Sequence, residues 1–119
     1  MWGMAAQLPD SEIDTIAKYF SEQLPAKGEG GNPAEIAAGK KIFEEGVASQ
    51  DVPPCGACHD DNAEGKQVFP RLAGQRRSYL EKQLEAFAAN LRENEIMHEN
   101  ARHLSAQQIS EVTAYLSSL

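Results

Sequence analysis

The chain has 119 residues, with 11 lysines and arginines against 18 aspartates and glutamates, so its formal net charge is −7. A chain of this length builds one small domain, with room for one additional helix. An acidic chain without clustered cations is poorly suited to binding phosphates, which argues against nucleic acid as a partner. No apolar run approaches the ~20 residues of a membrane span, and no leader with a signal-peptide pattern opens the chain.

Four segments show the periodicity of amphipathic helices, and no segment shows the alternation of a strand. The first helix is predicted to begin at Pro9-Asp10 and to run to Leu24. Its apolar face carries Ile13, Ile16, Ala17, Phe20 and Leu24. Pro25 is predicted to end this helix, and the glycine-rich run 28–31 predicts a short flexible linker.

Three further helices follow along the chain. The second is predicted from the capping residue Asn32 to Gly46, the third over about 76–92, and the fourth from the capping residue Ser105 to the end. Their core faces are, in order, Ile36, Gly39 and Phe43; Leu80, Leu84, Phe87 and Leu91; and Ile109, Val112, Leu116 and Leu119. Residues 47–75 lack a sustained period, and so long an irregular stretch in a small domain is usually functional.

The first and last helices resemble each other at a constant offset. Ile13 aligns with Ile109, and at the same offset Tyr19 aligns with Tyr115. The residues upstream agree as well, because Met1 aligns with Met97 and Leu8 with Leu104. The N-terminal segment therefore resembles a repeat of the end of the chain.

Cys55-Gly56-Ala57-Cys58-His59 is a C-x-x-C-H sequence, the attachment signature of a c-type haem. Thiols at this spacing can add to the two vinyl groups of one porphyrin edge, and the histidine is then held against the iron as the proximal ligand. The alternatives are a structural disulfide, half of a zinc site and a thioredoxin-like dithiol. A thioredoxin-like dithiol occurs in a βαβ unit, and the sequence shows no strands. A zinc site would need further ligands, and His98 and His103 are the remaining candidates. The haem interpretation is favoured over all three.

A six-coordinate haem needs a second axial ligand, and Met97 is the only methionine beyond the first four residues. It is predicted to lie in a loop before the last helix, among polar neighbours where a core methionine would be out of place. A neutral thioether favours ferrous iron and raises the reduction potential relative to a second histidine. Met97 is therefore the expected distal ligand, with His98 as its main rival and His103 as a weaker one.

The residues after this motif resemble a known family. The run Phe69-Pro70-Arg71-Leu72-Ala73-Gly74-Gln75, with Tyr79-Leu80 and Lys82-Gln83-Leu84, is similar to the post-haem segment of class I cytochromes c of the c4/c5-like group. The positions of Gly39, Phe43 and Tyr115 match a helix–helix contact of that family. The resemblance implies an all-α class I cytochrome c fold wrapped around one covalent haem c, with an extra N-terminal helix. It also implies that the Pro70 carbonyl accepts the Nδ1 proton of His59.

The resemblance divides the chain into two parts. Residues 32–119 are expected to form a monohaem cytochrome c domain, and residues 1–31 an N-terminal helix with its linker. The latter resemble the end of the preceding domain in a dihaem cytochrome c4, in which Met1 would fall at that domain's axial methionine. No C-x-x-C-H precedes residue 55, so one haem is expected.

The function that the resemblance implies is one-electron transfer between periplasmic redox partners, without enzymatic activity. The partners would dock transiently at the exposed haem edge, near Val52, Pro53, Pro54 and Phe69. An exported protein would carry a signal peptide that this chain lacks. Two alternatives stay open, namely a haem domain or subunit of a larger oxidoreductase and a haem enzyme with an open distal site. The N-terminal helix is expected to dock on the haem domain or on a second copy, giving a homodimer.

Overall fold

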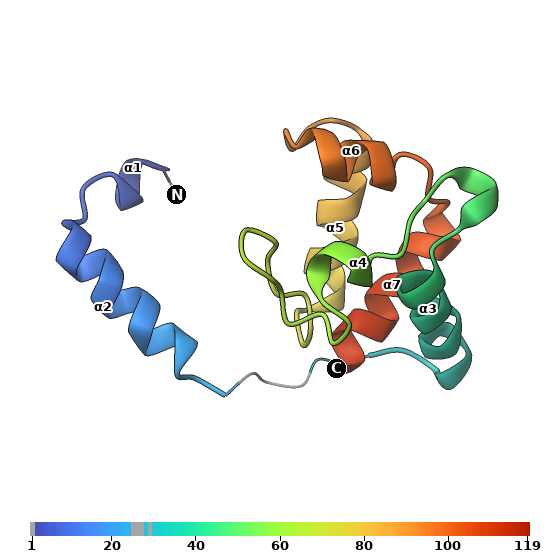
Figure 1. The fold of residues 1–119 in the computed structure, drawn as a ribbon, viewed down its shortest axis with the longest axis horizontal. Coiled ribbons are helices and arrows are strands. Elements are labelled where there is room, and N and C mark those ends of the chain that lie inside the picture. The colour runs from blue at the N-terminus through green and yellow to red at the C-terminus, as the bar shows by residue number, and fades with distance from the viewer. Residues whose placement is uncertain (1, 25–27, 29) are drawn as a thin grey trace.

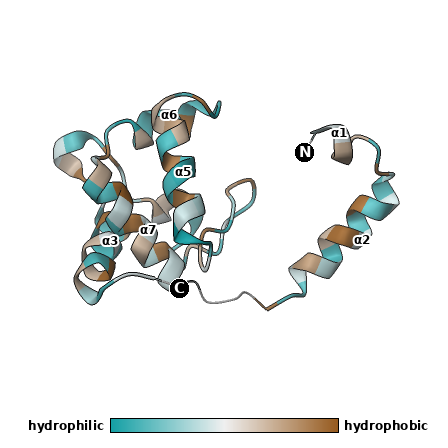
Figure 2. Ribbon diagram, turned by 180° about the vertical axis from the view of Figure 1, so that it is seen from behind, coloured by the Kyte–Doolittle hydropathy of each residue, from teal (hydrophilic) through white to brown (hydrophobic). Residues whose placement is uncertain are grey.

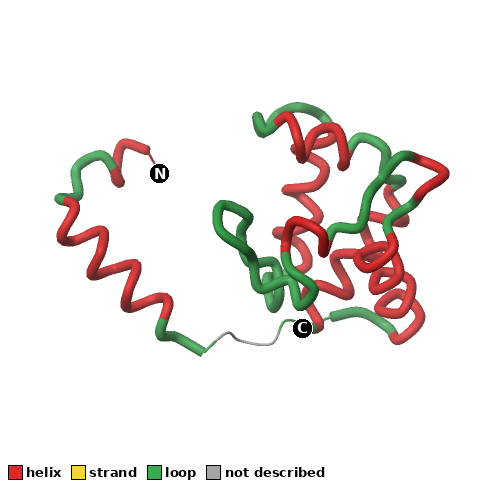
Figure 3. Tube along the Cα trace, viewed as in Figure 1, coloured by secondary structure: helices red, strands yellow, loops and turns green. Residues whose placement is uncertain are grey.

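The computed structural model describes residues 2–24, 28 and 30–119 (Figure 1). Its elements in chain order are α1 (Trp2–Ala5), α2 (Asp10–Ser21), α3 (Pro33–Glu45), the 3-10 helix η1 (Ala48–Gln50), α4 (Gly56–His59), α5 (Arg77–Ala88), α6 (Glu95–Ala101) and α7 (Ala106–Ser118). The described residues form no strand and only two isolated bridges, so helices and loops make up the coloured trace of these residues in Figure 3. The predicted all-α fold class is confirmed. In this described part of the chain, no helix has the length and apolar character needed to cross a membrane.

Helices α3 and α7 cross at the centre of the domain and make its most extensive contact. Gly39 allows the two backbones to approach, because a Cβ at this position would collide with the carbonyl of Glu111 and lie 3.0 Å from the Cβ of Tyr115. Beside the crossing, the rings of Phe43 and Tyr115 pack with their centroids 5.6 Å apart. The helix–helix contact that the resemblance implied at these residues is therefore present.

The two helices begin where the sequence predicts, because both carry a capping box. The Asn32 side chain accepts a hydrogen bond from the Glu35 amide, and the Glu35 carboxylate accepts one from the Asn32 amide at 3.1 Å. Ser105 and Gln108 make the same reciprocal pair at the start of α7. These bonds satisfy amide groups that the first turn of a helix leaves without partners.

The end of α5 differs from the prediction. The helix stops at Ala88 instead of continuing to about residue 92. Asn90 adopts a left-handed conformation with φ of 53°, and the amide of Leu91 donates back to the Ala86 carbonyl at 2.8 Å. This arrangement is a Schellman-type helix end, and it turns Leu91 away from the core, leaving its side chain 83% exposed. The predicted burial of Leu91 is therefore wrong, and Leu119 is likewise exposed.

The long irregular stretch between α3 and α5 is folded firmly onto the core. Ala63 is fully buried, and its carbonyl accepts hydrogen bonds from the amides of Leu72 and Ala73 at 2.8 and 3.0 Å. The Gly74 amide donates to the Leu116 carbonyl of α7 at 3.0 Å. These bonds fix the loop on both sides of the turn that follows α4.

Helix α2 extends away from the domain of residues 32–119 and buries none of its residues (Figure 1). Ile13 and Ile16 are 43% and 44% exposed, and Phe20 is 67% exposed. Figure 2 shows the apolar bands along α2 with no neighbouring element over them. The expected docking of this helix on its own haem domain is therefore wrong. Helix α7 buries the equivalent face against α3, whereas the described residues provide no counterpart of α3 for α2.

The glycine-rich run before α3 is packed where the structure describes it. A Cβ at Gly28 would collide with the Ser117 carbonyl, and one at Gly31 would lie 2.8 Å from the Cβ of Ala114. Gly28 and Gly31 thus lie against the last turns of α7, and the prediction of a flexible linker is wrong for them. Met1 and Pro25 lie outside the described residues, and so does the predicted end of the first helix at Pro25.

Arg77 joins three helices through its guanidinium group. Its Nη2 lies 3.3 Å from Glu35 Oε1 on α3 and donates to Ser110 Oγ on α7 at 2.7 Å, while its Nε donates to Glu81 Oε1 at 3.1 Å. The hydrogen bond from Arg77 holds the pKa of the Glu35 carboxyl below its ordinary value. This interaction therefore favours the charged form of Glu35 in the folded protein.

We expect the Glu35→Gln variant to lose less stability than wild type as the pH falls below the ordinary glutamate pKa of about 4.3. A carboxyl whose pKa is lowered by folding stabilises the protein above the unfolded pKa, and this contribution disappears as the pH falls through the folded pKa. Glutamine keeps an acceptor for the capping bond and removes only the charge. Urea unfolding of the protein over a pH series measures the effect. Glu45→Gln, in an exposed pair with Lys41, is the control, and equal slopes for both variants would contradict the prediction.

Candidate haem site

The C-x-x-C-H sequence forms a single helical turn. Cys55 immediately precedes α4, and the amide of His59 donates to the Cys55 carbonyl at 3.0 Å. Both thiols are half-buried, and they are not joined as a disulfide. The turn therefore brings two sulfur atoms and one imidazole onto one short element, and the disulfide alternative is not found.

The His59 ring is buried and held in one orientation. Its Nδ1 lies 2.9 Å from the carbonyl oxygen of Pro70, and the ring meets Phe69 edge-on at 6.1 Å. A carbonyl oxygen can only accept, so Nδ1 carries a hydrogen, and in the neutral imidazole Nε2 then keeps its lone pair. The structure thus brings together the two residues that the resemblance paired.

Gly65 shapes the loop that carries Pro70 back to His59. Its φ is +85°, and a Cβ here would lie 2.7 Å from the amide nitrogen of Arg71 and 2.8 Å from the carbonyl oxygen of Phe69. The Gly65 amide also donates to the His59 carbonyl at 3.0 Å. A residue with a side chain would be strained in this conformation and would push the loop outward.

The surroundings of the thiols disfavour the other two alternatives. Burial raises the pKa of the Cys55 thiol to about 11, whereas dithiol oxidoreductases lower the pKa of their reactive cysteine. Over residues 2–24, 28 and 30–119, no three His, Cys, Asp or Glu side chains are grouped so that they could hold a metal ion. The thioredoxin-like and zinc interpretations therefore lack support, whereas two thiols followed by an oriented imidazole fit a covalent haem.

Met97 lies in α6, and the prediction that it belongs to a loop is wrong. Asn94 caps this short helix by accepting a hydrogen bond from the Met97 amide at 2.9 Å. The sequence signal that could have found the helix is Asn94 followed by the acidic Glu95. Helix α4 packs against α3 and α6 against α5, with α6 above α4 in Figure 1. The two expected axial ligands are therefore held by separate elements, and Met97 itself is half-buried.

The rival ligand His98 is occupied at one ring nitrogen. Its Nδ1 lies 2.7 Å from the carbonyl oxygen of Phe87 at the end of α5. This contact directs the His98 ring toward α5. His103 lies in the turn after α6 and is half-buried.

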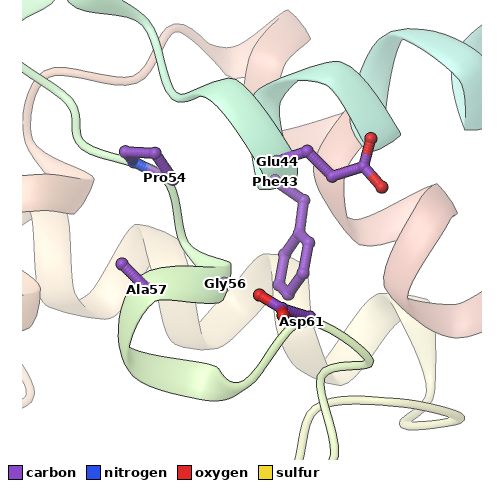
Figure 4. A pocket seen from close by; sticks show the side chains of 6 residues that line it. All are labelled: Phe43, Glu44, Pro54, Gly56, Ala57 and Asp61. Carbon is purple, nitrogen blue, oxygen red and sulfur yellow. The ribbon is translucent and has the colours of Figure 1, made fainter.

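A hollow of about 320 Å³ lies beside α4 and opens at the surface (Figure 4). Its lining residues are Phe43, Glu44, Pro54, Gly56, Ala57 and Asp61. Neither thiol nor the His59 ring belongs to this lining, so the hollow is separate from the C-x-x-C-H donors. The fully buried Phe43 ring reaches from α3 toward α4 here and supports the turn.

The expected apolar docking surface is only partly exposed. Val52 is only 3% exposed and belongs to the core. Its amide donates a hydrogen bond to the Val47 carbonyl at 3.2 Å. Phe69 is half-buried, with its ring against His59. Pro53 is exposed and Pro54 is half-buried. The prediction that Val52 contributes to a docking surface is therefore wrong.

A helical domain with a C-x-x-C-H turn, whose histidine ring is held in one orientation, has the features of a small c-type haem protein. A family model described as cytochrome c matches residues 36–119. The chain therefore belongs to the cytochrome c family, and it takes one covalent haem c through Cys55 and Cys58.

The comparisons with single proteins agree with this assignment. Cytochrome c-552 of Acidithiobacillus ferridurans is 39% identical over 120 residues, which cover 100% of this chain and 52% of the relative. The thiosulfate dehydrogenase electron acceptor of Stutzerimonas stutzeri is 38% identical over 88 residues, covering 72% of this chain and 41% of the relative. A solved cytochrome c4 structure from Acidithiobacillus ferrooxidans matches with a TM-score of 0.88 and 39% identity, covering 100% of this chain and 70% of that chain. The chain thus spans about half the length of curated relatives that it matches.

Proposed function

We propose that this chain is a one-electron carrier of the cytochrome c4 type, with His59 and Met97 as the axial ligands of its haem iron. The observation that carries the proposal is the hydrogen bond from His59 Nδ1 to the Pro70 carbonyl at 2.9 Å, because it leaves Nε2 as the ligating atom. When bound, the haem supplies the Fe(III)/Fe(II) couple.

The side chains of the site adjust this couple in two ways. The Pro70 carbonyl holds the hydrogen on Nδ1 of His59, which fixes the ring and makes Nε2 a stronger donor. The Met97 thioether is neutral and soft, so it favours the ferrous state and raises the reduction potential. Burial of the His59 ring keeps water from its edge, since only 7% of this residue is exposed.

The partners of the carrier would be redox proteins of the periplasm that dock at the exposed haem edge. Such complexes bury little surface and dissociate rapidly, which suits a shuttle. The relative named as an electron acceptor of thiosulfate dehydrogenase supports a role in taking electrons from an enzyme. A carrier of this kind performs no chemistry on a substrate of its own.

Optical potentiometric titration of the haem-loaded protein tests the proposal. We expect the titration to show a single one-electron transition. The mass of the denatured chain should still include one haem, because two thioethers hold it. The six-coordinate ferrous protein should bind carbon monoxide slowly and weakly. Ready binding of carbon monoxide to the wild-type protein would instead support a haem enzyme with an open distal site.

The exposed face of α2 favours a second proposal, namely that the chain associates through this helix. Ile13, Ile16 and Phe20 stand at helical spacing, and each is at least 43% exposed. Fully burying such a side chain is worth about 1.5–3 kcal/mol, so a second copy of the chain that covers this face would be bound appreciably. The longer relatives suggest another occupant of the same face, a preceding domain of a larger redox protein.

We expect sedimentation of the full chain to show a concentration-dependent dimer that the Ile16→Lys variant lacks. A lysine at position 16, between Ile13 and Phe20 along the apolar face, would have to be buried without a partner in the dimer, whereas in the monomer it would remain in water. Thr15→Lys adds the same charge to the polar face of α2 and serves as the control. Identical monomers for all three proteins would contradict a homodimer and leave the larger redox protein as the explanation of this face.

A further inference from the structure

Helix α6 is too short to hold its own orientation. It has seven residues, and an isolated helix of this length is unstable in water. Its position therefore depends on contacts with the rest of the domain. The Asn94 cap fixes its first turn, and Ala101 is fully buried at its last residue.

Between the Asn94 cap and Ala101, His98 is a residue through which α6 contacts α5. The Nδ1–H of His98 donates to the Phe87 carbonyl oxygen across 2.7 Å. Phe87 belongs to the last turn of α5, and its carbonyl also accepts a hydrogen bond from the Asn90 amide at 3.0 Å, so the imidazole is an additional donor at the end of α5. The acceptor is firmly placed, because the Phe87 ring is buried and the Arg92 guanidinium lies 4.6 Å from its centroid.

Met97 and His98 are consecutive residues of the same helix, so their side chains project about 100° apart around its axis. While His98 is bonded to α5, the rotation of α6 is set, and with it the direction in which the Met97 side chain leaves the helix. If the His98 bond were absent, α6 could rotate or lift between its cap and Ala101. Either movement would displace the thioether.

We propose that His98 is a positioning residue for Met97, and that its hydrogen bond to the Phe87 carbonyl holds α6 in the rotation that presents the thioether to the iron. The inference rests on the proposed ligation by Met97. His98 itself is directed toward α5, about 100° around the helix axis from Met97, and does not ligate the iron. Loss of the His98 bond should appear as a larger fraction of molecules in which the Met97 sulfur has left the iron.

Three variants of the haem-loaded protein test this inference. His98→Ala removes the donor, His98→Asn keeps an N–H donor at the δ position, and His98→Gln carries its amide one carbon further out. We expect ferrous His98→Ala to bind carbon monoxide roughly fivefold faster than wild type, the change that loss of one ordinary hydrogen bond corresponds to. The methionine–iron charge-transfer band of the ferric protein should weaken in parallel. His98→Asn should restore both values, His98→Gln should not, and His103→Ala should match wild type.

The outcomes separate this inference from the proposed function. If the wild-type band is present and disappears in Met97→Ala, but His98→Ala equals wild type, the positioning role is wrong and the ligation stands. Equal defects in His98→Asn and His98→Gln would overturn the hydrogen-bond explanation, and this comparison serves also if His98→Ala does not fold. A wild-type spectrum that changes with His98→Ala and is insensitive to Met97→Ala would make His98 the ligand and overturn both.

Discussion

Replacing Met97 by alanine is expected to lower the reduction potential by on the order of 100 mV, a moderate part of the ~0.8 V range over which axial ligands act. Loss of the thioether removes the ligand that favours ferrous iron. The weak long-wavelength charge-transfer band of the ferric protein should disappear, and the ferrous protein should bind carbon monoxide readily. Spectra of both redox states and a potentiometric titration measure these changes.

The matched control for this experiment is Met4→Ala. Met4 lies in α1, where its side chain is 72% exposed, and it should leave the spectrum and the potential unchanged. A wild-type protein that lacks the charge-transfer band, and whose spectrum does not change in Met97→Ala, would mean that another residue completes the iron coordination. His98 would then be the first residue to replace, because it follows Met97 directly in α6.

The Gly39→Ala variant is expected to lose about 3 kcal/mol of stability, at the upper end of the cost of overpacking a core. The added methyl group would meet the Glu111 carbonyl, which belongs to the backbone of α7 and cannot move aside as a side chain can. The α3–α7 crossing would have to open, and the contact between Phe43 and Tyr115 would open with it. Urea unfolding of the haem-loaded protein measures the loss.

Gly3→Ala is the control for the intrinsic effect of the substitution. Both glycines lie in helices, but nothing lies within 4 Å of a Cβ at Gly3. Alanine has the higher helix propensity, so this variant should be unchanged or slightly more stable. Similar losses of stability in the two variants would show that the close approach of the backbones at Gly39 does not cause the loss.

The sequence by itself determined the features that depend on neighbouring residues. The capping boxes at Asn32 and Ser105 place the starts of α3 and α7, because the bonds involved span only three residues. The spacing of Cys55, Cys58 and His59 indicates a covalent haem, since the chemistry requires all three groups within one helical turn. The apolar periodicity likewise identified the buried residues Phe43, Val112 and Leu116.

Only the tertiary structure decided the features that depend on distant contacts. Helices α4 and α6 have four and seven residues, which is too short for a periodicity to be recognised, and packing against α3 and α5 stabilises them. The apolar face of α2 has the same pattern as that of α7, yet the first is exposed and the second is buried. Periodicity specifies that a face is apolar, whereas burial requires a partner element, and in the described residues α3 supplies that partner only to α7.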